Sequence, residues 1–163
     1  MSNRPILSIV AAIVVAFAAA GCATQTSPLS VADTIAAKPQ LSTLNGLVAK
    51  TGLADTLKGT GPFTVFAPSN EAFAKVPAKT MDDLSKDPAK LKAVLTYHVV
   101  PGKVMAADVK NGNSKTVNGA NLALSKAGDF VTVENAVVQT ADISATNGVV
   151  HIVDSVLIPP ATR

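Results

Sequence analysis

Residues 142–159 read DISATNGVVHIVDSVLIP, and this stretch decides the fold class. Asn147-Gly148 is a strong signal for a type I′ turn, whose two central residues both take positive φ. The run that follows, residues 149–158, is rich in β-branched residues and is closed by Pro159-Pro160, so it predicts a final strand. Asp142 and Ile143 are expected on the loop that leads into the turn.

The segments before this stretch also have the character of short strands. Apolar and β-branched runs alternate there with Gly and Asn, which break strands and favour turns. These patterns predict strands at residues 97–100, 115–117, 121–125, 130–134 and 137–139.

Helical patterns dominate the earlier part of the chain. Apolar residues recur at helical spacing, and possible N-cap residues precede them. These caps are Ser30, the pair Ser69-Asn70, Thr80 and Asp87, and a single strand is expected at residues 63–67. Helices come first and strands after, without repeated alternation, so the sequence indicates an α+β fold with an antiparallel or mixed sheet.

The amino-terminal residues have the pattern of a secretory signal. Residues 6–20 read ILSIVAAIVVAFAAA, and one basic residue, Arg4, precedes them. As a helix this run would span about 22 Å, which is short of the roughly 30 Å bilayer core. We therefore expect residues 1–21 to be an export signal and residues 30–160 to form one domain.

Cys22 is the one cysteine of the chain, so no internal disulfide can form. Ala19-Ala20-Gly21-Cys22 resembles the lipobox of bacterial lipoproteins, although Ala19 stands where that family usually has Leu. The resemblance implies that Cys22 is lipidated and becomes the new amino terminus. The alternative is an ordinary signal peptide with an incidental cysteine. Residues 22–29 are otherwise small and polar, and we expect a flexible tether.

Charge excludes one class of partner. The net charge is +3, and the lysines are scattered among acids. Aromatic residues make up only 4% of the chain. Nucleic-acid binding, which requires a basic patch and often stacking aromatics, is not expected.

Three segments together resemble one family, the fasciclin or FAS1 domain. They are residues 64–73 (TVFAPSNEAF), residues 97–102 (YHVVPG) and residues 142–159. The resemblance implies a wedge-like pair of twisted β-sheets flanked by α-helices, and membership of a group of adhesion and matrix modules that are secreted or membrane-anchored. The positions that carry it are Thr64, Phe66, Pro68, Asn70, Phe73, Tyr97, His98, Asn147, Gly148, His151, Asp154 and Pro159.

The two histidines, His98 and His151, raise the question of a metal site. Zinc usually requires three or four ligands, and the sequence has neither a His-x-x-x-His motif nor a pair of cysteines. We interpret both as core histidines that bond to the backbone. No catalytic motif is present either, so neither an enzyme nor a cofactor is expected.

Other polar residues are open to two interpretations. Asn70 and Asp154 could form a binding edge. The favoured interpretation is that Asn70 caps the helix after the first strand and that Asp154 accepts hydrogen bonds from backbone donors. In adhesive members of the family an Asp-Ile pair at the place of Asp142 and Ile143 has been assigned to integrin contact. The resemblance therefore implies an interaction site there; the alternative is that the pair preserves only a turn and a buried Ile.

Two functions remain from the sequence. The first is an exported, lipid-anchored, non-catalytic module for cell–cell or cell–surface attachment, monomeric or weakly self-associating, whose partner is a protein or carbohydrate. The alternative is a periplasmic or surface carrier of a small apolar or carbohydrate ligand. A pocket of several hundred cubic ångströms lined by apolar side chains would favour the carrier, and a flat or ridged exposed patch would favour adhesion.

Overall fold

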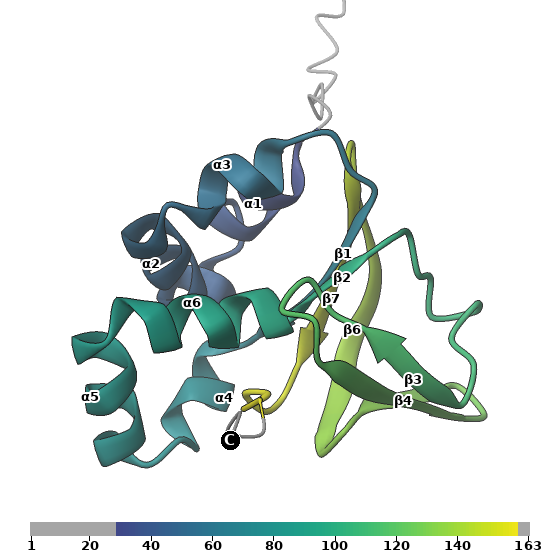
Figure 1. Cartoon of the computed structure of the whole chain (residues 1–163). Coiled ribbons are helices and arrows are strands. Elements are labelled where there is room, and N and C mark those ends of the chain that lie inside the picture. Colours follow the sequence, from purple (N-terminus) through teal and green to yellow (C-terminus); the bar gives the residue numbers. More distant parts are fainter. Residues whose placement is uncertain (1–28, 160–163) are drawn as a thin grey trace, which may run out of the picture.

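A computed structural model describes residues 29–159 of the chain. The expected signal and Cys22 lie outside the described residues. Helices come first and most strands follow (Figure 1). The helices are α1 (Val31–Ala36), the 3₁₀ turn η1 (Pro39–Leu41), α2 (Ser42–Thr51), α3 (Leu53–Lys58), α4 (Asn70–Ala74), α5 (Ala78–Lys86) and α6 (Pro88–Tyr97). The strands are β1 (Phe63–Pro68), β2 (Val99–Pro101), β3 (Gly112–Lys115), β4 (Asn121–Ala127), β5 (Phe130–Val133), β6 (Ala136–Ala145) and β7 (Gly148–Val153). The α+β prediction is confirmed.

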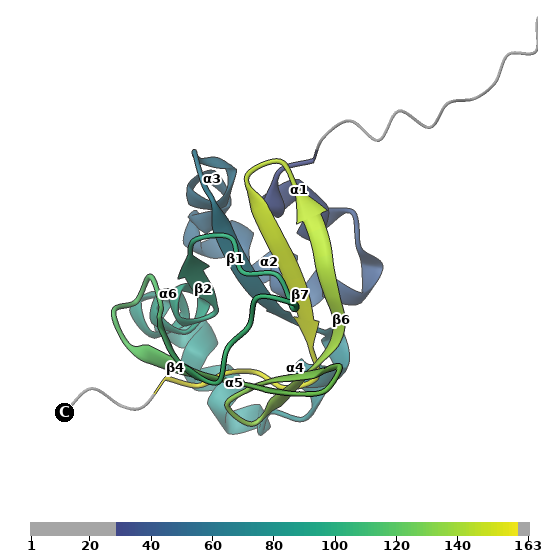
Figure 2. The ribbon, with the colours of Figure 1, turned by 90° about the vertical axis from the view of Figure 1, so that its right-hand side faces the viewer.

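The strands form a mixed sheet in the order β2-β1-β7-β6-β5-β4-β3. β1 and β7 pair in parallel, and the other neighbours pair antiparallel. The long strand β6 pairs with β5 near its start and with β7 along the rest of its length, so it joins two halves of the sheet. The sheet curls until Val117, beyond β3, donates a 2.8 Å hydrogen bond to the carbonyl of Val99 in β2. The expected pair of twisted sheets is thus one nearly closed sheet, of which Figure 2 shows β2, β1, β7 and β6 side by side.

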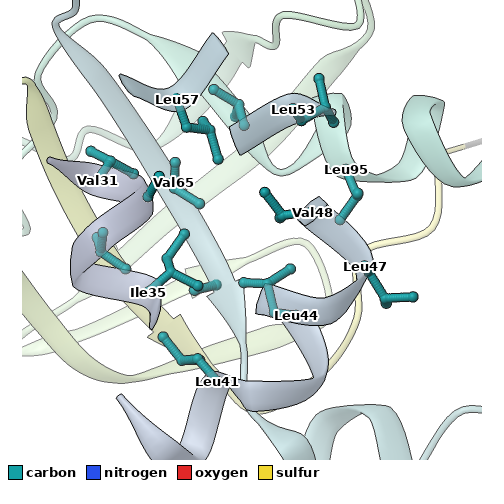
Figure 3. Close-up of a cluster of buried hydrophobic side chains, with 14 of the residues drawn as sticks. Val31, Ile35, Leu41, Leu44, Leu47, Val48, Leu53, Leu57, Val65 and Leu95 are labelled. Carbon is teal, nitrogen blue, oxygen red and sulfur yellow. The ribbon is translucent and has the colours of Figure 1, made fainter. Parts of the chain in front are cut away.

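The helices cover one face of the β1–β7 region. Apolar side chains from α1, α2, α3 and α6 meet Val65 of β1 (Figure 3). Burying an aliphatic side chain of this size stabilises a fold by about 1.5–3 kcal/mol, so this cluster dominates the attachment of the helices. Its labelled members are Val31, Ile35, Leu41, Leu44, Leu47, Val48, Leu53, Leu57, Val65 and Leu95.

A second cluster fills the space between the two halves of the sheet. Phe66 and Tyr97 are its largest side chains, and both are fully buried. Leu122 and Val133, from the inner faces of β4 and β5, are completely buried against them. The alternation of buried and exposed residues along β4 and β5 is the period-2 pattern of a half-buried strand.

Helix caps agree with the sequence at Ser30, Ser69 and Asp87 and disagree at Thr80. Ser30 accepts from the backbone N–H of Asp33, and Asp87 accepts from the N–H groups of Ala89 and Lys90. The expected cap at Thr80 is wrong. Helix α5 begins at Ala78, directly after Pro77, so Thr80 lies inside the helix.

The expected strand limits also need correction. Tyr97 is the last residue of α6, not the first of a strand, and β2 begins only at Val99. The strand expected at residues 115–117 lies earlier, as β3. The last strand ends at Val153, whereas residues 154–158 continue without strand pairing. Apolar residues extend to Ile158 because the chain after β7 still packs on the core, through Leu157.

Candidate functional site

His98 directly follows α6 and is 1% exposed. Its Nδ1 lies 2.7 Å from the carbonyl oxygen of Val94, and its Nε2 accepts from the backbone N–H of Leu157 at 3.0 Å. An amide N–H can only donate, so the ring is neutral with its hydrogen on Nδ1. Burial lowers the pKa of His98 to about 4. The ring therefore joins α6 to the segment after β7, as the interpretation of a core histidine requires.

Tyr97, its neighbour, joins the same helix to the other half of the sheet. The Tyr97 hydroxyl contacts the carboxylate of Glu134 and lies 3.1 Å from the carbonyl oxygen of Asn121. Burial and the neighbouring carboxylate raise the pKa of Tyr97 well above its usual value. The hydroxyl therefore stays protonated and acts as a donor.

His151, in the middle of β7, has the opposite tautomer. Its Nδ1 accepts from the backbone N–H of Asp142 at 3.1 Å, so Nε2 carries the hydrogen and donates to the carbonyl of Val104 at 2.8 Å. The ring stacks on Phe66 with 5.5 Å between centroids. Burial lowers the pKa of His151, which is consistent with a neutral ring. Both nitrogens of each histidine are thus used by the backbone, and neither ring offers a lone pair to a metal.

Asp142 and Ile143 do not lie on a loop, which corrects the sequence-based expectation. Both belong to β6, at an irregularity in its pairing with β7. Asp142 takes a φ of 57°, and its Oδ1 accepts from the backbone N–H of Ala106 at 2.7 Å. Ile143 is partly buried against the helical core cluster. The pair therefore holds the fold together at a β-bulge, which aims side chains differently from a regular strand.

The segment from Gly102 to Ala106 is fastened to the sheet by three motif side chains. Thr64 donates to the carbonyl of Gly102 at 2.7 Å and accepts from the N–H of Val104 at 2.8 Å. His151 and Asp142 supply the contacts already described. Sequence reasoning did not identify this function for Thr64, because its partners are about forty residues away and nothing in the local pattern indicates them.

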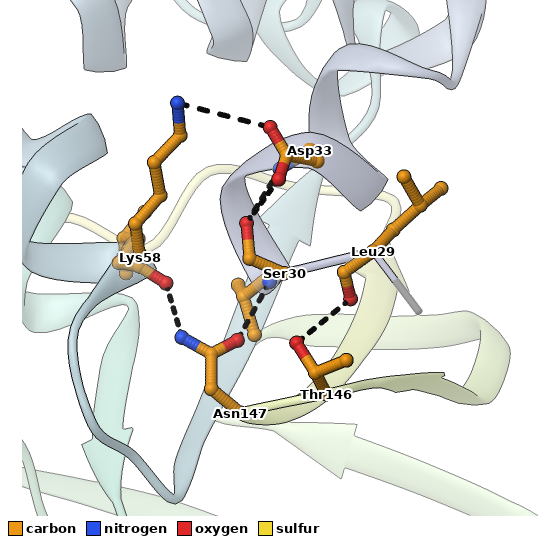
Figure 4. Close-up of polar contacts among 8 residues, drawn as sticks. Leu29, Ser30, Asp33, Lys58, Thr146 and Asn147 are labelled. Carbon is orange, nitrogen blue, oxygen red and sulfur yellow. Dashed lines mark hydrogen bonds and ion pairs between the residues drawn. The ribbon is translucent and has the colours of Figure 1, made fainter. Parts of the chain in front are cut away.

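Asn147 holds together three segments that are distant in sequence (Figure 4). Its Oδ1 accepts from the N–H of Val31 at 2.8 Å, at the start of α1. Its Nδ2 donates to the carbonyls of Leu57 at 2.6 Å and Gly59 at 2.8 Å, at the end of α3. One side-chain amide thus satisfies backbone groups at the ends of two helices, which would otherwise lack partners.

The expected type I′ turn at Asn147-Gly148 is wrong. Ala145 pairs with Gly148, so the connecting residues are Thr146 and Asn147, and neither Asn147 nor Gly148 has a positive φ. Gly148 is required for another reason. A Cβ there would collide with the carbonyl oxygen of Phe63, because β1 and β7 approach closely.

Asn70 caps a helix, but a different one from that expected. Ser69 caps α4, since its hydroxyl accepts from the N–H of Ala72 at 3.2 Å. The Asn70 amide instead accepts from the N–H of Thr43 at 3.0 Å and donates to the carbonyl of Pro39 at 3.1 Å. It therefore fixes the start of α2.

Asp154 satisfies backbone donors, as favoured from the sequence. Its Oδ1 accepts from the N–H of Val137 at 2.8 Å, and this bond is the main reason that the pKa of Asp154 lies below its usual value. Lys75 lies 3.5 Å from Oδ2.

The other motif positions are structural by location. Phe73 packs, partly buried, against the helical core cluster. Pro68 ends β1 opposite Val153, and Pro159 is half-buried at the end of the described chain.

Cavities in the described residues are small or open. An apolar cavity of about 30 Å³ lies between α2, α3, α6 and β1, beside His98. Hollows of about 330 Å³ and 320 Å³ open to the surface, the first beside Asn147 and the second beside Val109. Within residues 29–159, no group of three His, Cys, Asp or Glu side chains could hold a metal ion. No helix in this range is long and apolar enough to cross a membrane.

Comparisons with known proteins agree with this geometry. A family model described as "Fasciclin domain" matches residues 39–159. A Synechocystis protein, sll1483, is 42% identical over 138 residues, which cover 82% of this chain and 76% of that protein. The "cell surface glycolipoprotein MPB83" of Mycobacterium bovis is 39% identical over 136 residues, 80% of this chain and 61% of that one.

Two further likenesses support the same family. The "immunogenic protein MPB70" of Mycobacterium bovis is 41% identical over 128 residues, which cover 76% of this chain and 65% of that protein. A solved FAS1 domain pair from the insect cell adhesion molecule fasciclin I has a TM-score of 0.64 at 18% identity, covering 80% of this chain and 51% of that one. Together the family and the surface relatives indicate an extracellular interaction module. The chain belongs to the fasciclin family.

Proposed function

We propose that this protein is an exported, lipid-anchored and non-catalytic attachment module of the cell envelope. The observation that carries the proposal is that the polar motif side chains are used in holding the fold. Thr64, His98, Asn147 and His151 each bond to backbone groups of distant segments. A catalytic site needs at least one such group free to reach a substrate, and these are not free.

The carrier alternative receives no support from the interior. A carrier of a small apolar ligand needs a pocket of a few hundred cubic ångströms, whereas the apolar cavity beside His98 holds only about 30 Å³. That volume is close to the space of one water molecule.

The start of the domain suits a tethered module. The backbone N–H of Thr146 donates to the carbonyl of Leu29 at 2.9 Å. Figure 4 shows that the Thr146 hydroxyl lies 3.3 Å from the same carbonyl and that Asn147 accepts from the N–H of Val31. A force on the chain before Leu29 would therefore act directly on the turn between β6 and β7. Seven extended residues, 23–29, would reach about 25 Å from a lipidated Cys22. Many copies on one membrane could then act together, because each further contact is intramolecular.

Two experiments test this proposal. Replacing Cys22→Ser should move the protein from the membrane fraction to the soluble exported fraction, and fatty-acid labelling should mark the native chain but not the variant. A deletion strain should attach less to surfaces and sister cells, and attachment should return with the native gene. Normal attachment of the deletion strain, together with a stoichiometric small ligand on the purified protein, would replace this proposal with the carrier.

A further inference from the structure

One long stretch of the described chain has a net positive charge, although the remainder is slightly negative. Between the start of β2 and the end of β4, residues 99–127, the chain has four lysines and one acid, a net charge of +3. The rest of residues 29–159 has eight lysines and ten acids, a net charge of −2. We call residues 99–127 the basic region. Its lysines are Lys103, Lys110, Lys115 and Lys126.

These lysines are not neutralised by acidic side chains. The three ion pairs within the described part of the chain involve Lys58, Lys75 and Lys90, all outside the basic region. Lys110 and Lys115 are exposed. Their charges therefore act on solvent and on whatever approaches the surface.

The basic region also contains an open hollow of about 320 Å³. Its walls come from the β2–β3 connection, β3 and β4. Amide, hydroxyl and ammonium groups and one carboxylate, that of Asp108, line it beside a few aliphatic side chains. This mixture suits sugar hydroxyls and an occasional anionic group, which would lie on the lysine side. The lining residues used here are Val104, Lys110, Asn113, Ser114 and Leu124.

One wall of the hollow is built rigidly. The connection after β2 is fastened by Thr64, His151 and Asp142, as described above. Further along, the backbone N–H of Lys126 donates to the Asn111 side chain at 2.6 Å, and the Lys126 ammonium donates to the carbonyl of Ala107 at 3.1 Å. A wall that is already ordered loses little entropy on binding.

We propose that the basic region binds a negatively charged polysaccharide of a neighbouring surface. This deepens, and rests on, the proposed attachment function. A membrane is disfavoured because β3 and β4 lie away from the end where the described chain begins, in both views (Figures 1 and 2). An acidic protein is disfavoured because protein interfaces usually centre on buried aromatic or large apolar side chains, whereas this hollow is lined by lysine, aspartate, asparagine and serine beside aliphatic residues.

The test uses beads that carry the purified full-length chain, with fluorescent alginate, a carboxylated polysaccharide, as probe and neutral dextran as reference. The native chain should retain alginate over dextran at low salt and release it as salt screens the charges. The variant K110E/K115E should retain at least about tenfold less alginate, since two attractive contacts become repulsive. K110Q/K115Q should show a smaller loss.

A matched control separates local from net charge. K50E/K92E changes the net charge equally, on exposed residues of α2 and α6, and should stay within twofold of the native chain. Equal losses in both variants overturn the proposal, as does retention of anionic lipid vesicles or an acidic protein without retention of alginate. If cells of a deletion strain fail to attach but K110E/K115E cells attach normally, the attachment function stands and the basic region is not its contact surface.

Discussion

The backbone N–H of Asp142 donates a 3.1 Å hydrogen bond to Nδ1 of His151, across the bulge between β6 and β7. The bond requires a neutral ring, because a protonated Nδ1 would point a hydrogen at another hydrogen. The positive φ of Asp142 directs its N–H at the ring, and its carboxylate at the same time holds the N–H of Ala106. The bulge and the ring thus hold the connection after β2 in place together.

The stability of the domain should fall between pH 7.5 and pH 5. Burial lowers the pKa of both His98 and His151, so the unfolded chain takes up protons below about pH 6.5 while the folded chain resists. With a pKa of about 4 in the folded chain, His98 alone would lower the free energy of unfolding by about 2 kcal/mol at pH 5. Urea unfolding at several pH values measures how steeply the free energy of unfolding changes with pH, which we call the slope.

Two substitutions show how much of this pH dependence each histidine causes. Gln can donate and accept as the neutral ring does but does not titrate, so H98Q should remove most of the slope and H151Q a further part. The depressed carboxyl pKa of Asp154 acts mainly below this window, because its stability is lost only as pH falls below the usual carboxyl range. A native chain equally stable at pH 7.5 and pH 5 contradicts the prediction.

Asp142 should tolerate Asn but not Ala. Asn keeps an acceptor for the N–H of Ala106 and takes a φ of 57° easily, so D142N should lie within about 0.5 kcal/mol of the native chain. D142A loses the acceptor and strains the backbone, at roughly 2 kcal/mol. D142G loses only the acceptor and should fall between them. Urea unfolding gives the order, and equal stability of the Ala and Gly variants would show that the backbone is not strained.

The fold class was predictable because local patterns determine most of its elements. Residues 121–125 and 130–134 alternate in hydrophobicity, and β4 and β5 follow within two residues. Asp87 followed by Pro88 fixes the start of α6. Tyr97 was placed in a strand because its β-branched neighbours favour one, but packing between the sheet halves continues the helix to that residue.

The polar contacts were less predictable because their partners are far apart in sequence. The burial of His98 follows from its apolar neighbours, but its bond to Leu157 spans 59 residues. Asn147 before Gly148 predicts a turn from local preference alone, whereas Asn147 in fact bridges to Val31 and to Leu57, more than 85 residues away. The charge of the basic region can be counted from the sequence, but the hollow beside Lys110 and the fastening of its wall come from contacts between distant segments.

Replacing Asn147 by Asp should be severely destabilising, although the shape hardly changes. The carboxylate would still accept from Val31, but it would face the carbonyl oxygens of Leu57 and Gly59 without a hydrogen to donate. Two partly buried acceptors would lose their partner and meet a negative charge, so we expect the free energy of unfolding to fall by about 3 kcal/mol.

Asn118 provides the matched control for this change. It is exposed and also precedes a glycine, so N118D makes the same chemical change where the surroundings do not depend on it. Its stability should remain within about 0.5 kcal/mol of the native chain. Thermal melting at neutral pH compares the stability of the two variants. A mild effect of N147D would mean that the hydrogen bonds of Asn147 contribute little to the stability of the domain.

Gly148 should be the least replaceable glycine of the β1–β7 pairing. A Cβ at this position collides with backbone atoms of Phe63, which cannot move without separating the parallel strands β1 and β7. G148A should therefore cost at least about 3 kcal/mol, near the upper end for overpacking.

The opposite effect is expected for Gly46 in α2, because a Cβ there meets nothing within 4 Å and the backbone is helical. G46A should stabilise the domain by about 0.5–1 kcal/mol, because alanine loses less conformational entropy in a helix. Urea midpoints shifted in opposite directions are expected, and a G148A variant as stable as the native chain would show that β1 and β7 can separate at little cost.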